Sequence, residues 1–199
     1  MTPVLVLACS PRPGGNSDAL ADCFAEGVRS GGQPAEVLRL RDFRVRPCTG
    51  CGRCATSPGR QCMLAAGDDA EALFSRMLAA PLVCIAAPVY FYGPPAGLKA
   101  FIDRAQRFWR ADGAGGTARQ EGGALWAGLV AGRPRGEKLF LGTELSLKYW
   151  GLALGLKLAE CHHCLNCDGP DALRQDRARC EVIRAWGRRA AAAAARRAE

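Results

Sequence analysis

Short apolar runs that alternate with helix-like segments are the feature of this sequence that most limits its possible folds. Three such runs consist of branched or small apolar residues and cover residues 4–8, 81–87 and 124–130. They are typical of central parallel strands, because helices cover both faces of such a strand. Shorter strands are predicted at 34–40 and 156–159. The alternation predicts a doubly wound α/β sandwich with a five-stranded parallel sheet.

Helices are predicted where apolar side chains recur every three or four residues. The first helix is expected to start at Asn16 or Ser17, one of which would be its N-cap, and to end at Gly31. A second helix is expected to open at Asp68–Asp69. A later helix is expected to bury four large side chains, which are Leu141, Leu145, Tyr149 and Leu152.

Length and cysteine content predict one reduced domain. A chain of 199 residues can bury a core without disulfides, so residues 1–199 are interpreted as one domain with a cysteine-rich insert at about 41–67 and a second cysteine-rich loop at about 161–167. Eleven cysteines and an opening without a signal-peptide pattern predict a cytoplasmic protein. The segment 77–98 is uncharged, but its prolines exclude a continuous membrane helix. A glycine-rich loop is predicted at 110–123.

The positive charge does not by itself indicate nucleic-acid binding. The formal net charge is +8, and residues 171–199 contribute half of it, with eight arginines against four acidic residues. A solvated helix face accounts for such a run. No nucleic-acid recognition motif accompanies the charge, so no nucleic-acid partner is predicted.

The loop after the first predicted strand carries polar groups suited to a phosphate. It runs from Cys9 to Ser17 and lacks the G-x-G-x-x-G spacing of dinucleotide sites. Where a strand passes through such a loop into a helix, unpaired amide groups and the helix dipole attract an anion. The hydroxyl, amide and guanidinium groups here suit a terminal phosphate monoester. They belong to Ser10, Arg12, Asn16 and Ser17.

Four cysteines lie within fifteen residues, at spacings of two, two and seven intervening residues. They are Cys48, Cys51, Cys54 and Cys62. Glycines and few apolar side chains separate them, so they are interpreted as a ligand set rather than as core residues. Such compact spacing suits a 4Fe-4S cluster, in which each thiolate reaches a different iron. Zinc and a set of free thiols are the alternatives.

A second cysteine group repeats the two-residue spacing near the fifth predicted strand. It comprises Cys161, Cys164 and Cys167, with Cys180 further along. A second cluster, a zinc site, a redox thiol group or a loop without function are all compatible with this pattern. If the second and fifth strands are opposite edges, four spacings of ~4.8 Å separate them by roughly 19 Å. The two groups of one chain should therefore not share a metal.

Several of these motifs together resemble the flavodoxin-like NADPH-dependent FMN reductase family, and most of all its iron-sulfur flavoproteins. They are Ser10-Pro11-Arg12 with Gly15-Asn16-Ser17, the compact cysteine motif followed by Asp68-Asp69, Pro88-Val89-Tyr90-Phe91, and Leu98-Lys99-Ala100-Phe101-Ile102-Asp103-Arg104. The resemblance implies a sheet of order 2-1-3-4-5 and FMN at the carboxyl ends of strands 1, 3 and 4. It also implies a 4Fe-4S cluster on the compact motif. Homodimers or homotetramers in which cluster and flavin approach across subunits are implied as well.

Position by position, the resemblance implies three sets of FMN contacts. The phosphate would be held by Ser10, Arg12, Gly15, Asn16 and Ser17. The isoalloxazine ring would be flanked by Pro88, Val89, Tyr90, Phe91, Tyr92 and Gly93. The loop from Ala131 and Gly132 to Gly136 would close its other side.

The leading functional hypothesis is a redox flavoprotein that passes electrons between FMN and a 4Fe-4S cluster, without an acid-base catalytic residue. Its donor or acceptor would be NAD(P)H or a ferredoxin-like redox partner protein. One alternative is an NAD(P)H-dependent FMN or quinone reductase with structural or zinc-bound cysteines. The other is a non-enzymatic electron carrier or metal-binding module. The cysteine insert is expected at the same sheet edge as FMN.

Overall fold

A parallel five-stranded sheet forms the centre of the computed structural model, which describes residues 2–109 and 123–197. The strands lie in the order β2-β1-β3-β4-β5, which confirms the predicted order. They are β1 (Val4–Ala8), β2 (Ala35–Arg39), β3 (Leu82–Pro88), β4 (Gly123–Val130) and β5 (Leu156–Cys164). The glycine-rich loop predicted at 110–123 lies, except for its last residue, outside the described residues.

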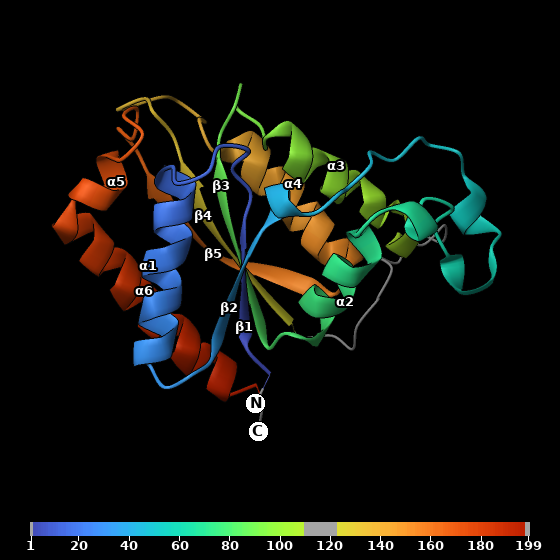
Figure 1. Ribbon diagram of the computed structural model, residues 1–199, viewed down its shortest axis with the longest axis horizontal. Helices are drawn as coiled ribbons and strands as arrows, with labels where there is room; N and C mark the ends of the chain where they lie inside the picture. The colour runs from blue at the N-terminus through green and yellow to red at the C-terminus, as the bar shows by residue number, and fades with distance from the viewer. Residues whose placement is uncertain (1, 110–122, 198–199) are drawn as a thin grey trace.

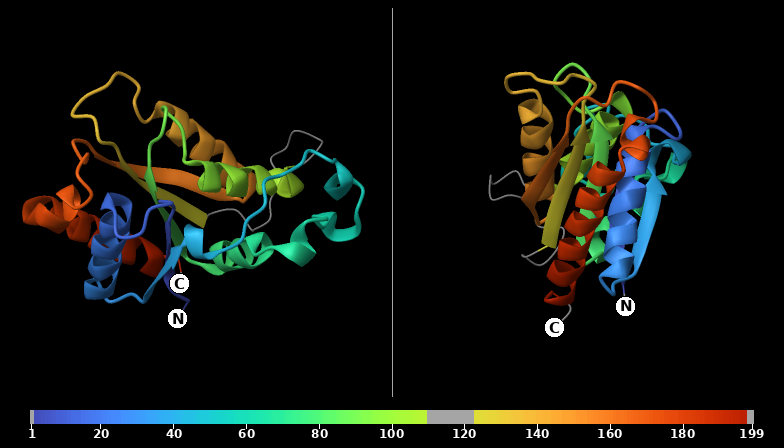
Figure 2. Two further views of the ribbon diagram at one scale, coloured as in Figure 1. Left: turned by 45° about the horizontal axis from the view of Figure 1, so that its top comes forward. Right: turned by 90° about the vertical axis from the view of Figure 1, so that its left-hand side faces the viewer.

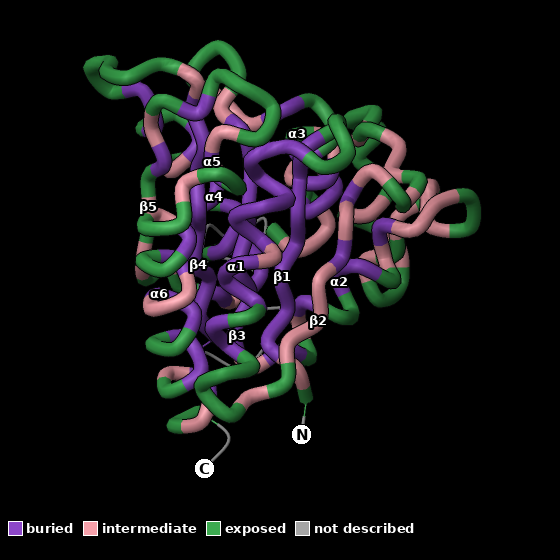
Figure 3. Tube along the Cα trace, turned by 60° about the vertical axis from the view of Figure 1, so that its left-hand side comes forward, coloured by how far each residue is buried: buried purple, intermediate pink, exposed green. Residues whose placement is uncertain are grey.

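Helices cover both faces of the sheet (Figure 1). One layer contains α1 (Asn16–Ser30), α5 (Ala172–Gln175) and α6 (Arg177–Ala195), and the other contains α2 (Ala70–Ala79), α3 (Ala96–Arg104) and α4 (Leu141–Ala153). Successive side chains of β1 pack alternately against the two helical layers. Leu5 and Leu7 pack under α2, α3 and α4, whereas Val6 packs under α1 and α6. All residues of β1, β3 and β4 are buried (Figure 3), as expected of central parallel strands.

Two glycines allow α1 and α6 to lie in direct backbone contact, side by side in the right-hand view of Figure 2. A Cβ atom on Gly27 would lie 2.1 Å from the carbonyl oxygen of Arg184, and one on Gly187 would lie 2.2 Å from that of Phe24. Neither distance leaves room for a methyl group. The helix that follows the first loop is therefore fixed against the C-terminal helix.

The predicted N-cap of α1 is wrong by one residue. Gly15 is the N-cap, Asn16 and Ser17 are already helical, and no side chain caps the helix. Asn16 does not cap because its side chain is used by a distant segment, as described below.

The predicted buried face of α4 is also wrong. Leu145 and Tyr149 are 44% and 56% exposed, and the other two predicted residues, Leu141 and Leu152, are exposed as well. The buried face instead contains Thr143, Leu147, Trp150, Gly151 and Ala153. A Cβ atom on Gly151 would lie 2.7 Å from the carbonyl oxygen of Leu156, so α4 approaches β5 on its small-residue side. The larger apolar stripe is left on the surface.

The fifth strand is longer than predicted and contains a β-bulge. It continues through Cys164, so the expected loop at 161–167 is a strand for its first half. The register against β4 shifts between Leu125 and Trp126, which leaves one unpaired residue in β5 and reverses which face later side chains occupy. After the bulge, Glu160 hydrogen-bonds Trp186 of α6, whereas His163 contacts Glu144 of α4.

The uncharged segment 77–98 contains the end of α2, all of β3 and the start of α3. Among the described residues, no helix has the length and apolar character needed to cross a membrane.

Candidate functional site

Three loops meet at the carboxyl edge of the sheet, at the top of Figure 1. They follow β1, β3 and β4. Backbone hydrogen bonds extend the strand pairing into them, from Cys9 N to Ala86 O at 2.8 Å and from Val89 N to Val130 O at 2.9 Å. Ligands of open α/β sheets bind at this edge, beside the point where the strand order reverses. The fold thus brings together the loops that were predicted to hold FMN.

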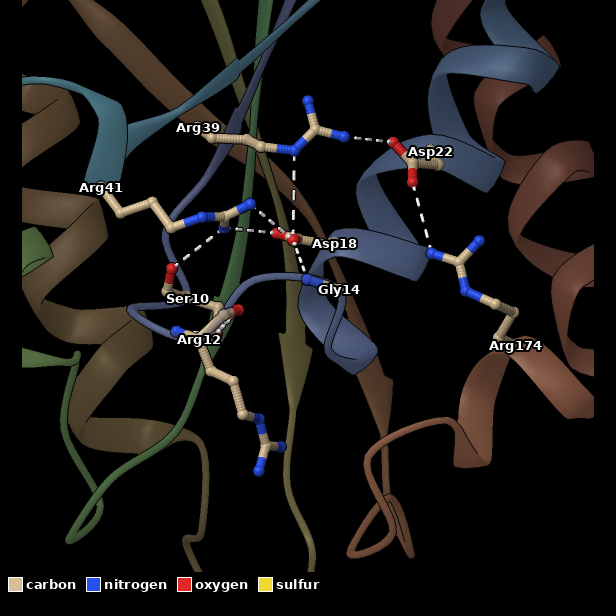
Figure 4. A network of polar contacts seen from close by, with 8 residues as sticks. All are labelled: Ser10, Arg12, Gly14, Asp18, Asp22, Arg39, Arg41 and Arg174. Atoms are coloured by element: carbon tan, nitrogen blue, oxygen red, sulfur yellow. Dashed lines mark hydrogen bonds and ion pairs between the residues drawn. The ribbon is translucent and has the colours of Figure 1, made fainter.

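The loop after β1 is braced by its own backbone and by Ser10. The Ser10 hydroxyl accepts from Arg12 N at 3.2 Å and lies 3.1 Å from Arg12 O. Gly14 has φ +70°, a conformation that disfavours larger residues. The Arg12 guanidinium points away from the buried polar network (Figure 4), and its Nε lies 3.4 Å from the position of a Cβ atom on Gly15. Arg12 is exposed beside the N-terminus of α1.

Asp18 anchors this loop, and sequence reasoning missed it (Figure 4). Its buried carboxylate accepts from Gly14 N at 2.8 Å and from both terminal nitrogens of Arg41, at 3.0 and 2.8 Å. Arg41 also donates to Ser10 O at 3.3 Å, and Arg39 lies 4.0 Å from the same carboxylate. The available signal was an acidic residue in the first helical turn together with two arginines at the end of β2. The loop after β1 is thereby fixed by the segment that leads into the cysteine insert.

Asn16 joins α1 to the segment after β5. Its side-chain nitrogen donates to the carbonyl oxygens of Cys167, at 2.9 Å, and Gly169, at 2.7 Å, and its oxygen accepts from Leu173 N at 2.9 Å. These three hydrogen bonds engage the Asn16 side chain within the protein, so only the backbone amide of Asn16 can face an anion. Ser17 is buried beside it. The first-turn amides of α1 have no side-chain cap, which suits an anion site.

The loop after β3 displays aromatic side chains on a strained turn. Pro88 ends the buried strand, and Tyr90 and Gly93 exchange backbone hydrogen bonds of 3.0 and 2.9 Å. Phe91 and Tyr92 between them have φ values of +49° and +64°, where asparagine or glycine is usual. Each such residue costs of order 1–3 kcal/mol. The Phe91 side chain is fully exposed. Strain of this kind is typical of functional loops.

The loop after β4 is tied to the one after β5. Ala131 is buried, and its carbonyl oxygen accepts from Cys167 N at 3.0 Å. A Cβ atom on Gly132 would lie 2.9 Å from Asp168 Oδ1, so a larger residue would push these loops apart. The exposed segment 133–138 follows and stands at the same edge as the β1 and β3 loops.

The four cysteines of the insert line one cavity of about 500 Å³. The insert projects sideways from the three-layer core, beside the C-terminal end of α3 and the short helix η5 (Ala105–Phe108), as Figures 1 and 2 show. Three arginines and Trp109 complete much of the wall. The lining residues used below are Cys48, Cys51, Cys54, Cys62, Arg60, Arg104 and Arg107. All four cysteines of the compact motif therefore line the same cavity.

That site does not lie at the sheet edge where it was expected. Helix α3 starts next to the aromatic loop and ends at Arg104 in the cavity wall. Its nine residues span about 13 Å at 1.5 Å per residue. The insert leaves β2 at the carboxyl edge, but its thiols lie beyond the far end of α3. Within one chain, the three loops at the carboxyl edge and the cysteine cavity are separate places.

Backbone amides and a hydroxyl group favour negative charge on two of the sulfur atoms. Gly50 N donates to Cys48 Sγ at 3.4 Å. The backbone amide of Arg53 and then the Thr49 hydroxyl lower the pKa of the Cys51 thiol below its usual value. Gly50 and Gly52 have positive φ values of +66° and +68°, which allow the chain to turn between the cysteines. Hydrogen bonds to sulfur are one of the means by which proteins tune iron-sulfur clusters.

A neck of hydrogen bonds closes the insert where it meets the core. Arg44 N donates to Asp69 Oδ2 at 2.7 Å, and Asp69 N donates to Arg44 O at 2.8 Å. Arg46 N donates to Asp68 Oδ2 at 3.0 Å, and Arg104 pairs with the same oxygen. Burial opposes ionisation of Asp68, but the bonds from Arg104 and from the amides outweigh it and lower its pKa. The two ends of the insert are thus held together by protein contacts.

Within residues 2–109 and 123–197, no three His, Cys, Asp or Glu side chains stand close enough together to hold a metal ion. The four thiols surround the cavity without touching one another as a closed set would. Their number, the amide groups on two sulfurs and the arginines in the wall fit an anionic cluster ligated by thiolates.

The structure separates Cys161 from the other members of the second cysteine group. Because of the bulge in β5, Cys161 faces α4, where burial and Glu144 raise the pKa of its thiol to about 11. Cys164, Cys167 and Cys180 lie in the core under α1 and α6. Burial raises the pKa of Cys164 to about 12. The proposed ligand set of four is therefore not assembled.

The known proteins that are similar to this chain are consistent with one another. A family model described as NADPH-dependent FMN reductase matches residues 2–132. Iron-sulfur flavoproteins of Methanocaldococcus jannaschii and Methanosarcina thermophila are 31% and 33% identical to this chain, over 52% and 48% of it and 51% and 48% of those proteins. The chain thus spans about half the length of the curated relatives it matches. A solved NAD(P)H:quinone oxidoreductase from Methanothermobacter marburgensis matches with a TM-score of 0.68 at 19% identity, over 94% of this chain and 98% of that one.

The sheet order and the three loops at its carboxyl edge define a flavodoxin-like α/β protein. Because the family model covers more than half of its residues, the chain belongs to the NADPH-dependent FMN reductase family. The motifs in the first half of the sequence predicted this membership.

Proposed function

We propose that this chain passes electrons between FMN at the carboxyl edge of the sheet and a 4Fe-4S cluster bound by Cys48, Cys51, Cys54 and Cys62. The observation that carries the proposal is that all four cysteines line one cavity, together with three arginines. Two curated relatives named iron-sulfur flavoproteins support it. When bound, FMN can exchange electrons singly or in pairs, and a cluster exchanges them singly.

The chain's own groups would bind and orient FMN. The first-turn amides of α1 would donate to the phosphate, including those of Asn16 and Ser17, with the Ser10 and Ser17 hydroxyl groups and Arg12 beside them. The loop from Pro88 to Gly93 and the start of the next loop, Ala131 and Gly132, would flank the ring. The donor would be NAD(P)H or a ferredoxin-like redox partner protein.

Metal and flavin analysis tests this function. Protein purified without oxygen should contain about four iron and four sulfide per chain, together with FMN. Cys62→Ser should lose most of the iron and sulfide and keep FMN, because the cavity and the flavin loops are separate. The measurements are iron, acid-labile sulfide, zinc and flavin content.

Cys161→Ser is the matched control, because this exposed cysteine faces α4 and lies outside the cavity. It should leave all four contents unchanged. Flavin without iron or sulfide in the wild-type protein would contradict the proposal and favour a reductase with free or zinc-bound cysteines. Metal without flavin would favour a metal-binding module.

We also propose that the exposed stripe on α4 contacts a second copy of this chain, in the homodimer or homotetramer that the family resemblance implies. The stripe consists of Leu141, Leu145, Tyr149 and Leu152. Four large apolar side chains on one helix face form a patch of the kind that marks interaction sites. Its contact with the Phe91–Tyr92 loop at Gly142 makes it continuous with the flavin loops.

Leu145→Arg should lower the molecular mass of the assembly measured by analytical ultracentrifugation, because the interface would have to bury an unpaired charge. Val182→Arg is the control, since Val182 is equally apolar and 56% exposed but lies on α6, in the opposite layer. An unchanged mass for Leu145→Arg would show that α4 does not form the interface.

A further inference from the structure

Buried side-chain atoms without a hydrogen-bond partner, most of them arginine donors, are concentrated around the cysteine cavity. Among the described residues, eight buried side-chain atoms have no hydrogen-bond partner, and six of them belong to residues at or beside the insert. These six are Arg46 Nε, Arg60 Nε, Glu71 Oε1, Arg104 Nε, Arg104 Nη2 and Arg107 Nε. Buried polar groups are nearly always satisfied in native proteins, so such a concentration calls for a specific explanation.

Arg104 is the most constrained of these side chains. It is fully buried, and its Nη1 donates to Arg46 O at 3.2 Å and to the buried carboxylate of Asp68. Two contacts on one nitrogen fix the plane of the guanidinium group. Nε and Nη2 remain without hydrogen bonds, and Nη2 lies 4.0 Å from the nearest carboxylate, that of Glu71.

The Arg104 side chain, which carries these two nitrogens, lines the same cavity as the four cysteines, Cys62 among them. Glu71 pairs through Oε2 with Arg107 at 2.7 Å, and its Oε1 lies 4.0 Å from Arg104 Nη2, too far for a hydrogen bond. The acidic group in the wall, Asp103, is paired with Lys99 at 2.7 Å. The wall therefore contains two buried guanidinium nitrogens that no acceptor among the described residues satisfies by a hydrogen bond.

We propose that Arg104 is a positioning residue of the cluster site, and this inference rests on the proposed function. Its Nε and Nη2 groups donate to the Cys62 thiolate and to the neighbouring cluster sulfur, while Asp68 holds the guanidinium group in place. A thiolate-ligated cluster is anionic and gains further negative charge when it is reduced. Hydrogen bonds and positive charge at its sulfurs thus stabilise the reduced form more, and raise the reduction potential.

The decisive variant is the pair Arg104→Met with Asp68→Asn. Removing Arg104 alone would leave the Asp68 carboxylate buried without a partner, which destabilises proteins strongly. The double change removes both charges and keeps similar volumes. Arg104→Lys is the second variant, because lysine keeps the charge but not the fork of donors. Arg76→Met is the control, since Arg76 pairs with Glu36 on the exposed side of α2.

The readouts are the cluster's midpoint potential, followed by electron paramagnetic resonance, and the rate at which a chelator removes iron. The double variant should keep FMN and a native circular dichroism spectrum, show a more negative midpoint potential, and lose iron several-fold faster. Arg104→Lys should show a smaller shift in the same direction, and Arg76→Met should match wild type.

Wild-type potential and iron-loss rate in both the double variant and Arg104→Lys would overturn the role of Arg104 and leave the proposed function intact. Wild-type protein that binds FMN but no iron or sulfide would overturn the proposed function itself. If the double variant does not fold, Arg104→Lys decides the matter, because it preserves the pairing with Asp68.

Discussion

Gly27→Ala is expected to lower the free energy of unfolding by about 3 kcal/mol or more, near the upper end for overpacking. The added methyl carbon would lie 2.1 Å from the carbonyl oxygen of Arg184, which is a backbone atom and cannot rotate away. Relief requires α1 and α6 to move apart, and that motion would open the core of this layer. The measurement is urea unfolding followed by circular dichroism.

Gly97→Ala supplies the same substitution in open space. Gly97 lies in the first turn of α3, and a Cβ atom there would meet nothing within 4 Å. Alanine is the better helix former by up to about 1 kcal/mol, so this variant should be as stable as wild type or more so. Equal stability of the two variants would show that the helices do not pack as closely as described.

Asn16→Ala is expected to cost about 3 kcal/mol of unfolding free energy, at about 1 kcal/mol for each of three hydrogen bonds. The loss follows because the Leu173 amide and the carbonyls of Cys167 and Gly169 would be left without this partner. The variant should unfold at lower urea concentration even without FMN.

Ser17→Ala is the informative partner variant. Ser17 is buried, but its hydroxyl group forms no hydrogen bond with other residues that the structure describes. Removing this hydroxyl group should therefore weaken FMN retention and change the stability of the FMN-free protein little. Flavin release is measured by fluorescence after dilution. If Asn16→Ala left stability unchanged and only released FMN, its side chain would serve the ligand rather than the fold.

The central strands could be predicted because their sequences leave little choice. Runs such as Val4–Ala8 and Leu82–Pro88 are apolar at every position, and only a strand covered on both faces uses that pattern. The loop between β1 and α1 could be predicted for the same local reason, since a strand, a glycine turn and a helix start follow one another directly.

The exposed stripe of α4 shows why helix faces are harder to predict. Both sides of this helix carry apolar residues, so periodicity alone allows two orientations. The close approach of Gly151 to β5 decides between them, and that contact depends on where the strand lies. A preference for large side chains selected the wrong face.

Long-range contacts account for the other differences. Asp18 gains its role from Arg41, which is 23 residues away in sequence, and Asn16 gains its role from residues 167–173. The bulge in β5 depends on pairing with β4 and reverses the faces of Cys161 and Cys164. The spacing of residues within one segment of the sequence does not reveal such distant contacts.

The neck of the insert has a consequence for how cofactors could enter the chain. In a zinc finger the metal itself closes the loop, so folding waits for metal. Here the entropy of closing residues 47–67 is offset by the bonds between Arg44 and Asp69 and between Arg46 and Asp68. Closing the loop and filling it are therefore separate events. The proposed flavin and the proposed cluster are thus expected to load in either order, by different assembly routes.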